Sequence, residues 1–151
     1  MTALCDEELR ERFVGDGFVV IPGFLSADEV VQITENAERC VREQQRGAAD
    51  MVVYYHDEDE PQSLYYLRPN GDPFFTAFGQ TPRIKQIAAT LLGGSGIAGV
   101  PSWLDKPPGY IDPTLPHQDL YYQWLVPPCG VMFWFALDEV DEQNACLRYV
   151  R

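Results

Sequence analysis

Apolar residues recur at helical spacing along the first half of the chain. A helix is expected over about 27–45, because apolar side chains fall on one of its faces at Val30, Ile33, Ala37 and Val41. Ser26 precedes this stretch, and Glu29 follows three residues later with the spacing of a capping box. The N-terminal boundary of the helix is therefore predicted as well as its buried face.

Two further helices are indicated by the same kind of pattern. Leu9 and Phe13 stand four residues apart and predict a short amphipathic helix that ends at the glycines 15 and 17. Thr81-Pro82 supplies an N-cap and a proline at the first helical position. The apolar stripe that follows, before Gly93-Gly94, consists of Ile84, Ile87, Ala88, Leu91 and Leu92.

The pattern changes after residue 96 from helical spacing to short apolar runs. These runs are aromatic and β-branched and are separated by Pro, Gly and Asp, at residues 97–104, 119–126, 130–138 and 146–150. Such spacing is typical of successive strands in an antiparallel sandwich or barrel. The run 131–137 is apolar at every position, as a central strand would be. The expected fold class is α+β, with helices first and a sheet afterwards.

Charge and composition narrow the function classes. The chain has 151 residues, is 46% hydrophobic and carries a net charge of -12, from 11 Lys+Arg and 23 Asp+Glu. A single folded domain is expected, and the acidic surface disfavours nucleic acid and anionic lipid as partners. The four scattered cysteines predict reduced thiols, and no signal peptide or membrane span is visible in the sequence. A cytoplasmic location is the resulting expectation.

The strongest candidate for chemistry is the pair His117 and Asp119. Residues two apart on an extended strand point to the same face, so an imidazole nitrogen and a carboxylate oxygen converge. These are two of the three protein ligands of a facial triad that holds Fe(II). A bare His-x-Asp is a weak pattern, and a surface His–Asp pair at the start of a strand is the alternative interpretation.

Several ordered blocks resemble the phytanoyl-CoA dioxygenase family. The opening stretch from Phe13 to Ser26, with its Gly-Asp-Gly-Phe core, is similar to the start of these proteins. Later blocks follow in the order of the family: Leu91-Leu92-Gly93-Gly94, Lys106-Pro107-Pro108-Gly109, His117-Gln118-Asp119-Leu120-Tyr121-Tyr122, Trp134-Phe135-Ala136-Leu137-Asp138 and Asn144-Ala145-Cys146-Leu147-Arg148-Tyr149-Val150. The resemblance covers nearly the whole chain and is far more specific than His-x-Asp alone.

This resemblance implies a fold, a reaction and a set of site residues. The fold would be an incomplete double-stranded β-helix (a cupin-like jelly roll) at 96–151, flanked by the helix-rich part at 1–95. The implied reaction is Fe(II)- and 2-oxoglutarate-dependent hydroxylation of an unactivated C–H bond in a small organic substrate, with O₂. His117 and Asp119 would be iron ligands, and Trp134 and Ser102 would contact 2-oxoglutarate. An ordinary buried strand aromatic is the alternative for Trp134.

The family's third iron ligand is a histidine far downstream, followed by an arginine that binds 2-oxoglutarate. No histidine follows His117, and the only other one, His56, lies in an acidic stretch expected to be a solvated loop. The run from Cys146 to Val150 has the pattern of a strand and is not followed by a turn. The native protein is therefore expected to continue past Arg151. Residues 1–151 alone are expected to bind iron weakly and to be inactive.

Two other functions stay open at this point. One is a non-catalytic jelly-roll module that binds a partner, and the other is a cupin-type enzyme in which His117 and Asp119 hold a different divalent metal. Tyr121 and Trp124, close behind the His-x-Asp pair, either shape a substrate pocket or pack against neighbouring strands. The sequence does not determine the substrate or the oligomeric state.

Overall fold

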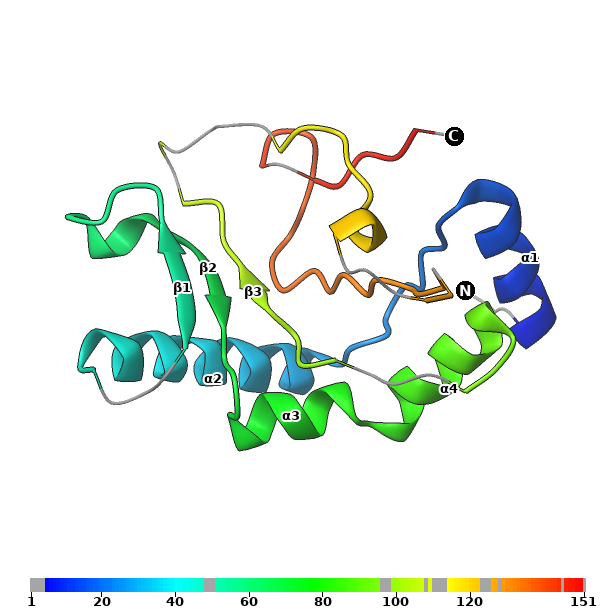
Figure 1. The fold of residues 1–151 in the computed structure, drawn as a ribbon, viewed down its shortest axis with the longest axis horizontal. Coiled ribbons are helices and arrows are strands. Elements are labelled where there is room, and N and C mark those ends of the chain that lie inside the picture. The colour runs from blue at the N-terminus through cyan, green and yellow to red at the C-terminus, as the bar shows by residue number, and fades with distance from the viewer. Residues whose placement is uncertain are drawn as a thin grey trace.

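The described part of the chain combines helices with one small antiparallel sheet. The computed structural model describes residues 5–47, 51–95, 99–107, 109, 114–122, 126–127, 129–144 and 146–150, without the side chains of Leu120 and Tyr122. The elements in chain order (Figure 1) are α1 (Asp6–Asp16), α2 (Ala27–Gln45), β1 (Val52–Tyr55), the 3-10 turn η1 (Pro61–Ser63), β2 (Leu64–Arg68), α3 (Pro73–Gly79), α4 (Pro82–Leu92), β3 (Trp103–Leu104) and the 3-10 turn η2 (Asp119–Tyr122). The α+β class is confirmed for these residues.

Helix α2 begins where its capping box predicts. The Ser26 hydroxyl accepts a hydrogen bond from the Glu29 backbone N–H at 3.2 Å, and the Glu29 carboxylate accepts one from the Ser26 N–H at 2.7 Å. Two N–H groups that lack partners within the helix are thereby paired. Glu29 also accepts a hydrogen bond from Arg83 of α4 at 2.7 Å, so the same carboxylate connects the start of α2 to α4.

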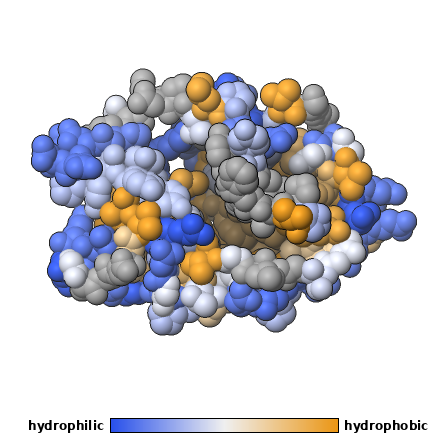
Figure 2. Space-filling model, in the orientation of Figure 1, coloured by the Kyte–Doolittle hydropathy of each residue, from blue (hydrophilic) through white to orange (hydrophobic). Residues whose placement is uncertain are grey.

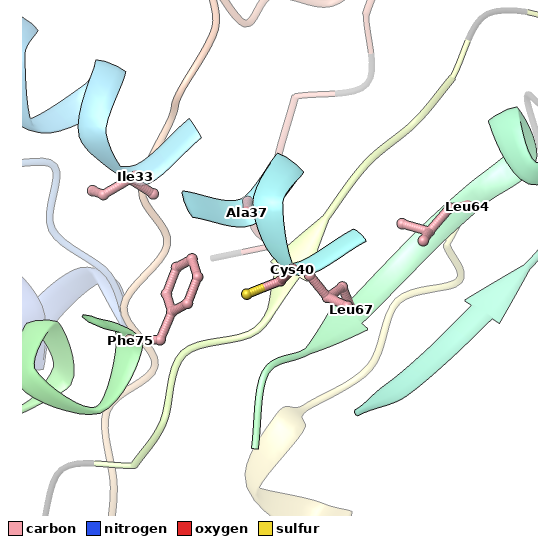
Figure 3. Close-up of a cluster of buried hydrophobic side chains, with 6 residues drawn as sticks. All are labelled: Ile33, Ala37, Cys40, Leu64, Leu67 and Phe75. Carbon is pink, nitrogen blue, oxygen red and sulfur yellow. The ribbon is translucent and has the colours of Figure 1, made fainter. Parts of the chain in front are cut away.

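The sheet has the order β1-β2-β3, with both pairs antiparallel. Helix α2 lies across one face of it, and α3 continues alongside α2 (Figure 1). Between helix and sheet lies the buried core, which Figure 3 shows in close-up: Ile33, Ala37, Cys40, Leu64, Leu67 and Phe75. Burying these apolar side chains is the main stabilising term that the fold offers.

Helices α1 and α4 pack against each other at the other end of the molecule (Figure 1). Helix α1 ends at Gly17, whose φ of 81° places it in the left-handed conformation that glycine adopts at low cost. The helices predicted around Leu9 and Phe13 and after Thr81-Pro82 are thus confirmed as α1 and α4. Gly17 and Gly93 are their C-caps, whereas Gly15, also expected at the end of α1, lies inside it. Thr81 precedes α4 as predicted, but its side chain makes no capping hydrogen bond.

The predicted strands after residue 96 are shorter than expected or are not formed within the described residues. Of 97–104, only Trp103–Leu104 is a strand, paired with Leu67 and Tyr66. The start of 119–126 is the 3-10 turn η2, which corrects the strand prediction there, and residues 123–125 lie outside the described residues. Residues 130–138 and 146–150 have no ladder partner in the described part of the chain, and a strand is defined by such pairing.

Residues 131–137 nonetheless alternate in burial as an extended segment does. Val131, Phe133, Phe135 and Leu137 are half-buried, whereas the three residues between them are exposed. The Phe135 ring packs against Phe24 and Phe78, with centroid distances of 5.6 and 5.4 Å. The expectation of a central strand at 131–137 is therefore not met in the described part of the chain, where the run is extended, has no ladder partner and is covered on one face.

Figure 2 shows that the face of the molecule turned to the viewer is hollowed near its middle, with hydrophobic surface at the floor of the hollow. At the left, around the turn between β1 and β2, the surface is hydrophilic. Among the described helices, none has the length and apolar character that crossing a membrane requires.

Candidate functional site

His117 and Asp119 come together at the start of η2. The His117 Nε2 atom lies 3.1 Å from Asp119 Oδ1, and both side chains are partly exposed. The backbone bends at Pro116, before His117, and enters the 3-10 turn η2 at Asp119. The sequence had predicted an extended strand over these residues. The predicted convergence of the two side chains is thus observed, although the backbone that produces it differs from the expected one.

The other ring nitrogen of His117 is fixed by the backbone. Nδ1 lies 2.7 Å from the Leu115 carbonyl oxygen, and because a carbonyl only accepts, Nδ1 carries the hydrogen. In the neutral imidazole, Nε2 then holds the lone pair and faces Asp119. Metal-bound histidines in proteins commonly donate their second N–H to a carbonyl in this way. The donor set fits two ligands of a divalent metal ion.

Protonation of His117 competes with this role. The hydrogen bond to Leu115 and the negative charge of Asp119 raise the pKa of His117 above its ordinary value. A metal ion and a proton would occupy the same Nε2 lone pair, so binding of a metal would release the proton. Beside the imidazole is an open cavity of about 240 Å³ lined by Pro116, His117, Gln118 and Tyr121.

Ser102 lies immediately before β3 and is joined to the neighbouring strand. Its hydroxyl is 3.0 Å from the Tyr66 hydroxyl of β2, and either oxygen can donate. Sequence reasoning did not identify Tyr66 as a site candidate, because the partners are 36 residues apart and meet only through β2–β3 pairing. The two hydroxyls form a polar pair that can accept or donate to a carboxylate.

Trp134 is 43% exposed, on the uncovered side of the extended segment 131–137. The alternative interpretation, an ordinary buried strand aromatic, does not describe it in this structure. Within the described residues, no hydrogen bond or ring contact joins Trp134 or Ser102 to the His117–Asp119 pair. The structure therefore brings two of the four predicted site residues into contact.

Among the described residues, no third metal donor lies with the pair. In the described part of the chain, no group of three or more His, Cys, Asp or Glu side chains is arranged to hold a metal ion. His56 lies in the turn after β1, where its ring packs on Tyr65 at 4.6 Å. Tyr121 is 80% exposed beside His117, and Trp124 lies outside the described residues.

Comparison with known proteins supplies the family. The family model described as phytanoyl-CoA dioxygenase (PhyH) matches residues 13–151. Ectoine dioxygenase of Stutzerimonas stutzeri (strain A1501) is 30% identical over 58% of this chain and 28% of its own length. Phytanoyl-CoA dioxygenase 1 of Oryza sativa subsp. japonica is 24% identical over 96% of this chain and 63% of its own length.

Phytanoyl-CoA dioxygenase domain-containing protein 1 of Bos taurus is 22% identical over 99% of this chain and 65% of its own length. The chain thus spans less than two thirds of each of these relatives. No solved structure gave a significant match. Because the family model covers the chain from residue 13 to its last residue, the chain belongs to the phytanoyl-CoA dioxygenase (PhyH) family.

Proposed function

We propose that the protein is an Fe(II)- and 2-oxoglutarate-dependent dioxygenase that hydroxylates an unactivated C–H bond of a small organic substrate. The observation that carries the proposal is the 3.1 Å approach of His117 Nε2 to Asp119 Oδ1, within a chain that matches the family from residue 13 onward. A nitrogen and a carboxylate oxygen from positions two apart are the first two ligands of a facial triad. We also propose that His117 and Asp119 belong to a cupin-like jelly-roll core.

The chain's own residues have defined tasks in this scheme. His117 and Asp119 hold the metal, and the Leu115 carbonyl keeps the His117 ring in the tautomer whose Nε2 is free to bind. When bound with 2-oxoglutarate, Fe(II) supplies the activation of O₂ that the hydroxylation of a C–H bond requires. His117 lines the open cavity beside Tyr121, which gives substrate and O₂ a route of approach to the pair.

We assign 2-oxoglutarate contacts to Trp134 and Ser102. The exposed Trp134 side chain offers an apolar surface and an indole N–H donor, and the Ser102–Tyr66 pair offers hydroxyl donors for a carboxylate. A coenzyme A thioester is disfavoured as substrate, because 11 basic residues against 23 acidic ones leave little to hold its phosphates. The proposed substrate is therefore a small organic molecule rather than a coenzyme A thioester.

The test is anaerobic absorption spectroscopy on the native protein that carries this sequence. Adding Fe(II) and then 2-oxoglutarate should give a visible charge-transfer band, and substitution His117→Ala should abolish it. Gln118→Ala is the matched control, since Gln118 lines the same cavity and is not a proposed ligand. A band that survives His117→Ala would refute the ligand assignment. Absence of any band in the native protein, together with no succinate formation, would refute the proposed reaction.

The third ligand is expected outside the described residues. We propose that residues 1–151 by themselves bind Fe(II) weakly and are inactive, because two ligands from one turn make a poor site. Titration of this segment with Fe(II) under argon measures the affinity directly. Tight binding of one iron per chain would show that residues 1–151 supply a complete set of ligands.

A further inference from the structure

A second cavity lies at the hairpin formed by β1 and β2. It measures about 370 Å³ and is lined by Val53, Tyr54, Tyr55, Glu58 and Tyr65. It shares no lining residue with the cavity beside His117. Its size falls within the range of small-molecule pockets. Three of its five lining residues are tyrosines and one is a carboxylate, so its chemistry differs from that of an ordinary apolar depression.

Tyrosines of both hairpin strands line this cavity. Tyr54 pairs with Tyr66, and the register shifts between Tyr54 and Tyr55, where the ladder has a bulge. Burial alternates along β1, with Tyr54 exposed and Tyr55 half-buried against the core, and both line the cavity at this edge strand of the sheet. The Tyr54 ring lies 6.2 Å from Tyr65 and 5.4 Å from Tyr66, and 53% of Tyr54 is exposed.

Glu58 lies in a turn whose backbone is held by hydrogen bonds. The buried Ser63 hydroxyl donates to the Asp57 carbonyl at 2.7 Å and accepts from the Asp57 N–H at 2.9 Å. Asp57 in turn accepts a hydrogen bond from the Asp59 N–H. These contacts hold the backbone on both sides of Glu58. Its own carboxylate has no hydrogen bond or ion pair within the described residues, and so it is available to a ligand.

The electrostatic character of the cavity is negative. Residues 57–60 are all acidic, and no lysine or arginine is among the lining residues. Tyrosine faces carry the negative part of the ring quadrupole and attract cations, most strongly those that are weakly hydrated. Anionic ligands would be repelled by the same arrangement. Aromatic faces combined with one unpaired carboxylate are the usual means of recognising an organic ammonium group.

We propose that this cavity binds the ammonium group of a small organic cation, with the tyrosine rings packing against it and Glu58 neutralising its charge. The proposal is independent of the iron and 2-oxoglutarate chemistry, since it uses none of those residues. It predicts a binding site that is present with or without a metal ion.

The first test is calorimetric titration of the protein with tetramethylammonium chloride. Sodium chloride at the same ionic strength corrects for screening of surface charge. Saturable binding is expected, with tert-butanol, an uncharged molecule of similar shape, binding at least about fivefold more weakly. If sodium chloride reproduces the tetramethylammonium signal, or if tert-butanol binds equally well, the proposal is wrong.

Substitutions separate the contributions of charge and rings. Glu58→Gln should weaken tetramethylammonium binding about fivefold, whereas Asp59→Asn removes the same charge from the same turn outside the cavity and should leave binding unchanged. Tyr54→Phe keeps the ring and should bind normally, while Tyr54→Leu should weaken binding about threefold. Equal effects of Glu58→Gln and Asp59→Asn would indicate attraction by the general acidic field and would overturn the site.

Discussion

The carboxylate of Asp72 and the guanidinium of Arg39 join α3 to α2, with 2.7 Å between Oδ2 and Nη2. Asp72 Oδ1 accepts hydrogen bonds from the Phe74 and Phe75 N–H groups, and so the same side chain is the N-cap of α3. The Asp72 side chain is only 4% exposed. Both helices thus depend on one buried carboxylate beside the core.

Removing this carboxylate should destabilise the fold markedly. For Asp72→Ala we expect the free energy of unfolding to fall by about 3 kcal/mol, because a cap is lost and Arg39 loses its buried partner. Chemical denaturation followed by circular dichroism measures the change. Glu38→Ala is the control, since Glu38 pairs with Arg42 at the exposed surface of α2 and should cost about 0.5 kcal/mol or less. Equal costs for the two variants would contradict the role given to Asp72.

Acid should weaken the same connection. Burial raises the pKa of Asp72, but the hydrogen bonds from Arg39 and from the α3 backbone outweigh it, and the pKa lies below its ordinary value. A depressed pKa in the folded state contributes stability that is present above the unfolded pKa of about 3.9 and is lost as the pH falls through the folded pKa. Asp72→Asn keeps a capping oxygen and removes the charge.

The stability difference between the wild type and Asp72→Asn should therefore be largest near neutral pH and shrink steadily below about pH 4. Urea titrations at several pH values between neutrality and the acid limit provide the measurement. A difference that stays constant over this range would mean that the Asp72 charge does not contribute, and that only the shape of the side chain matters.

Close packing at the end of α3 gives a further prediction. A Cβ atom added at Gly79 would lie 2.5 Å from the Gly99 carbonyl oxygen and 3.3 Å from Pro101. Since the backbone of the segment before β3 must then move, Gly79→Ala should lower the free energy of unfolding by about 1–3 kcal/mol. The melting temperature and the denaturation midpoint should both fall.

Gly15 is the matched control for this substitution. It also lies in a helix, α1, but a Cβ atom there meets nothing within 4 Å. Gly15→Ala should therefore raise stability by about 0.5–1 kcal/mol, because alanine loses less backbone freedom than glycine in a helix. If Gly79→Ala proved neutral or stabilising, the close approach of α3 to Gly99 would not exist in solution.

Local signals account for what the sequence predicted correctly. Capping chemistry and apolar spacing act within a few residues, and for this reason α2 and α4 begin and end near the predicted residues. Strands β1 and β2 were not predicted, although Val52–Tyr55 and Leu64–Arg68 are short β-branched and aromatic runs on either side of an acidic turn. The partner of each run is set by pairing across that turn, which joins Val52 to Arg68. Helix α3 was missed because it is only seven residues long.

In the candidate site, too, local contacts were predicted and contacts made by strand pairing were not. The contact between His117 and Asp119 follows from their spacing and survives the replacement of the expected strand by a turn. In contrast, the pairing of Ser102 with Tyr66 depends on β3 lying beside β2, which no pattern near either residue reveals. Short-range chemistry was therefore predictable, and the partner of Ser102 was not.

Tyr66 is the residue through which this missed contact can be tested. Its hydroxyl is 3.0 Å from Ser102, so Tyr66→Phe removes one of the two hydroxyls proposed to meet 2-oxoglutarate and leaves Ser102 without its partner. In the native protein, the dissociation constant for 2-oxoglutarate should rise about threefold to tenfold, as expected for the loss of one hydrogen bond. Titration of the charge-transfer band measures it. Tyr54→Phe is the control, because Tyr54 lies opposite Tyr66 and its hydroxyl has no partner within the described residues. Equal affinities in Tyr66→Phe and Tyr54→Phe would show that the Ser102–Tyr66 pair holds β3 against β2 and takes no part in binding the cosubstrate.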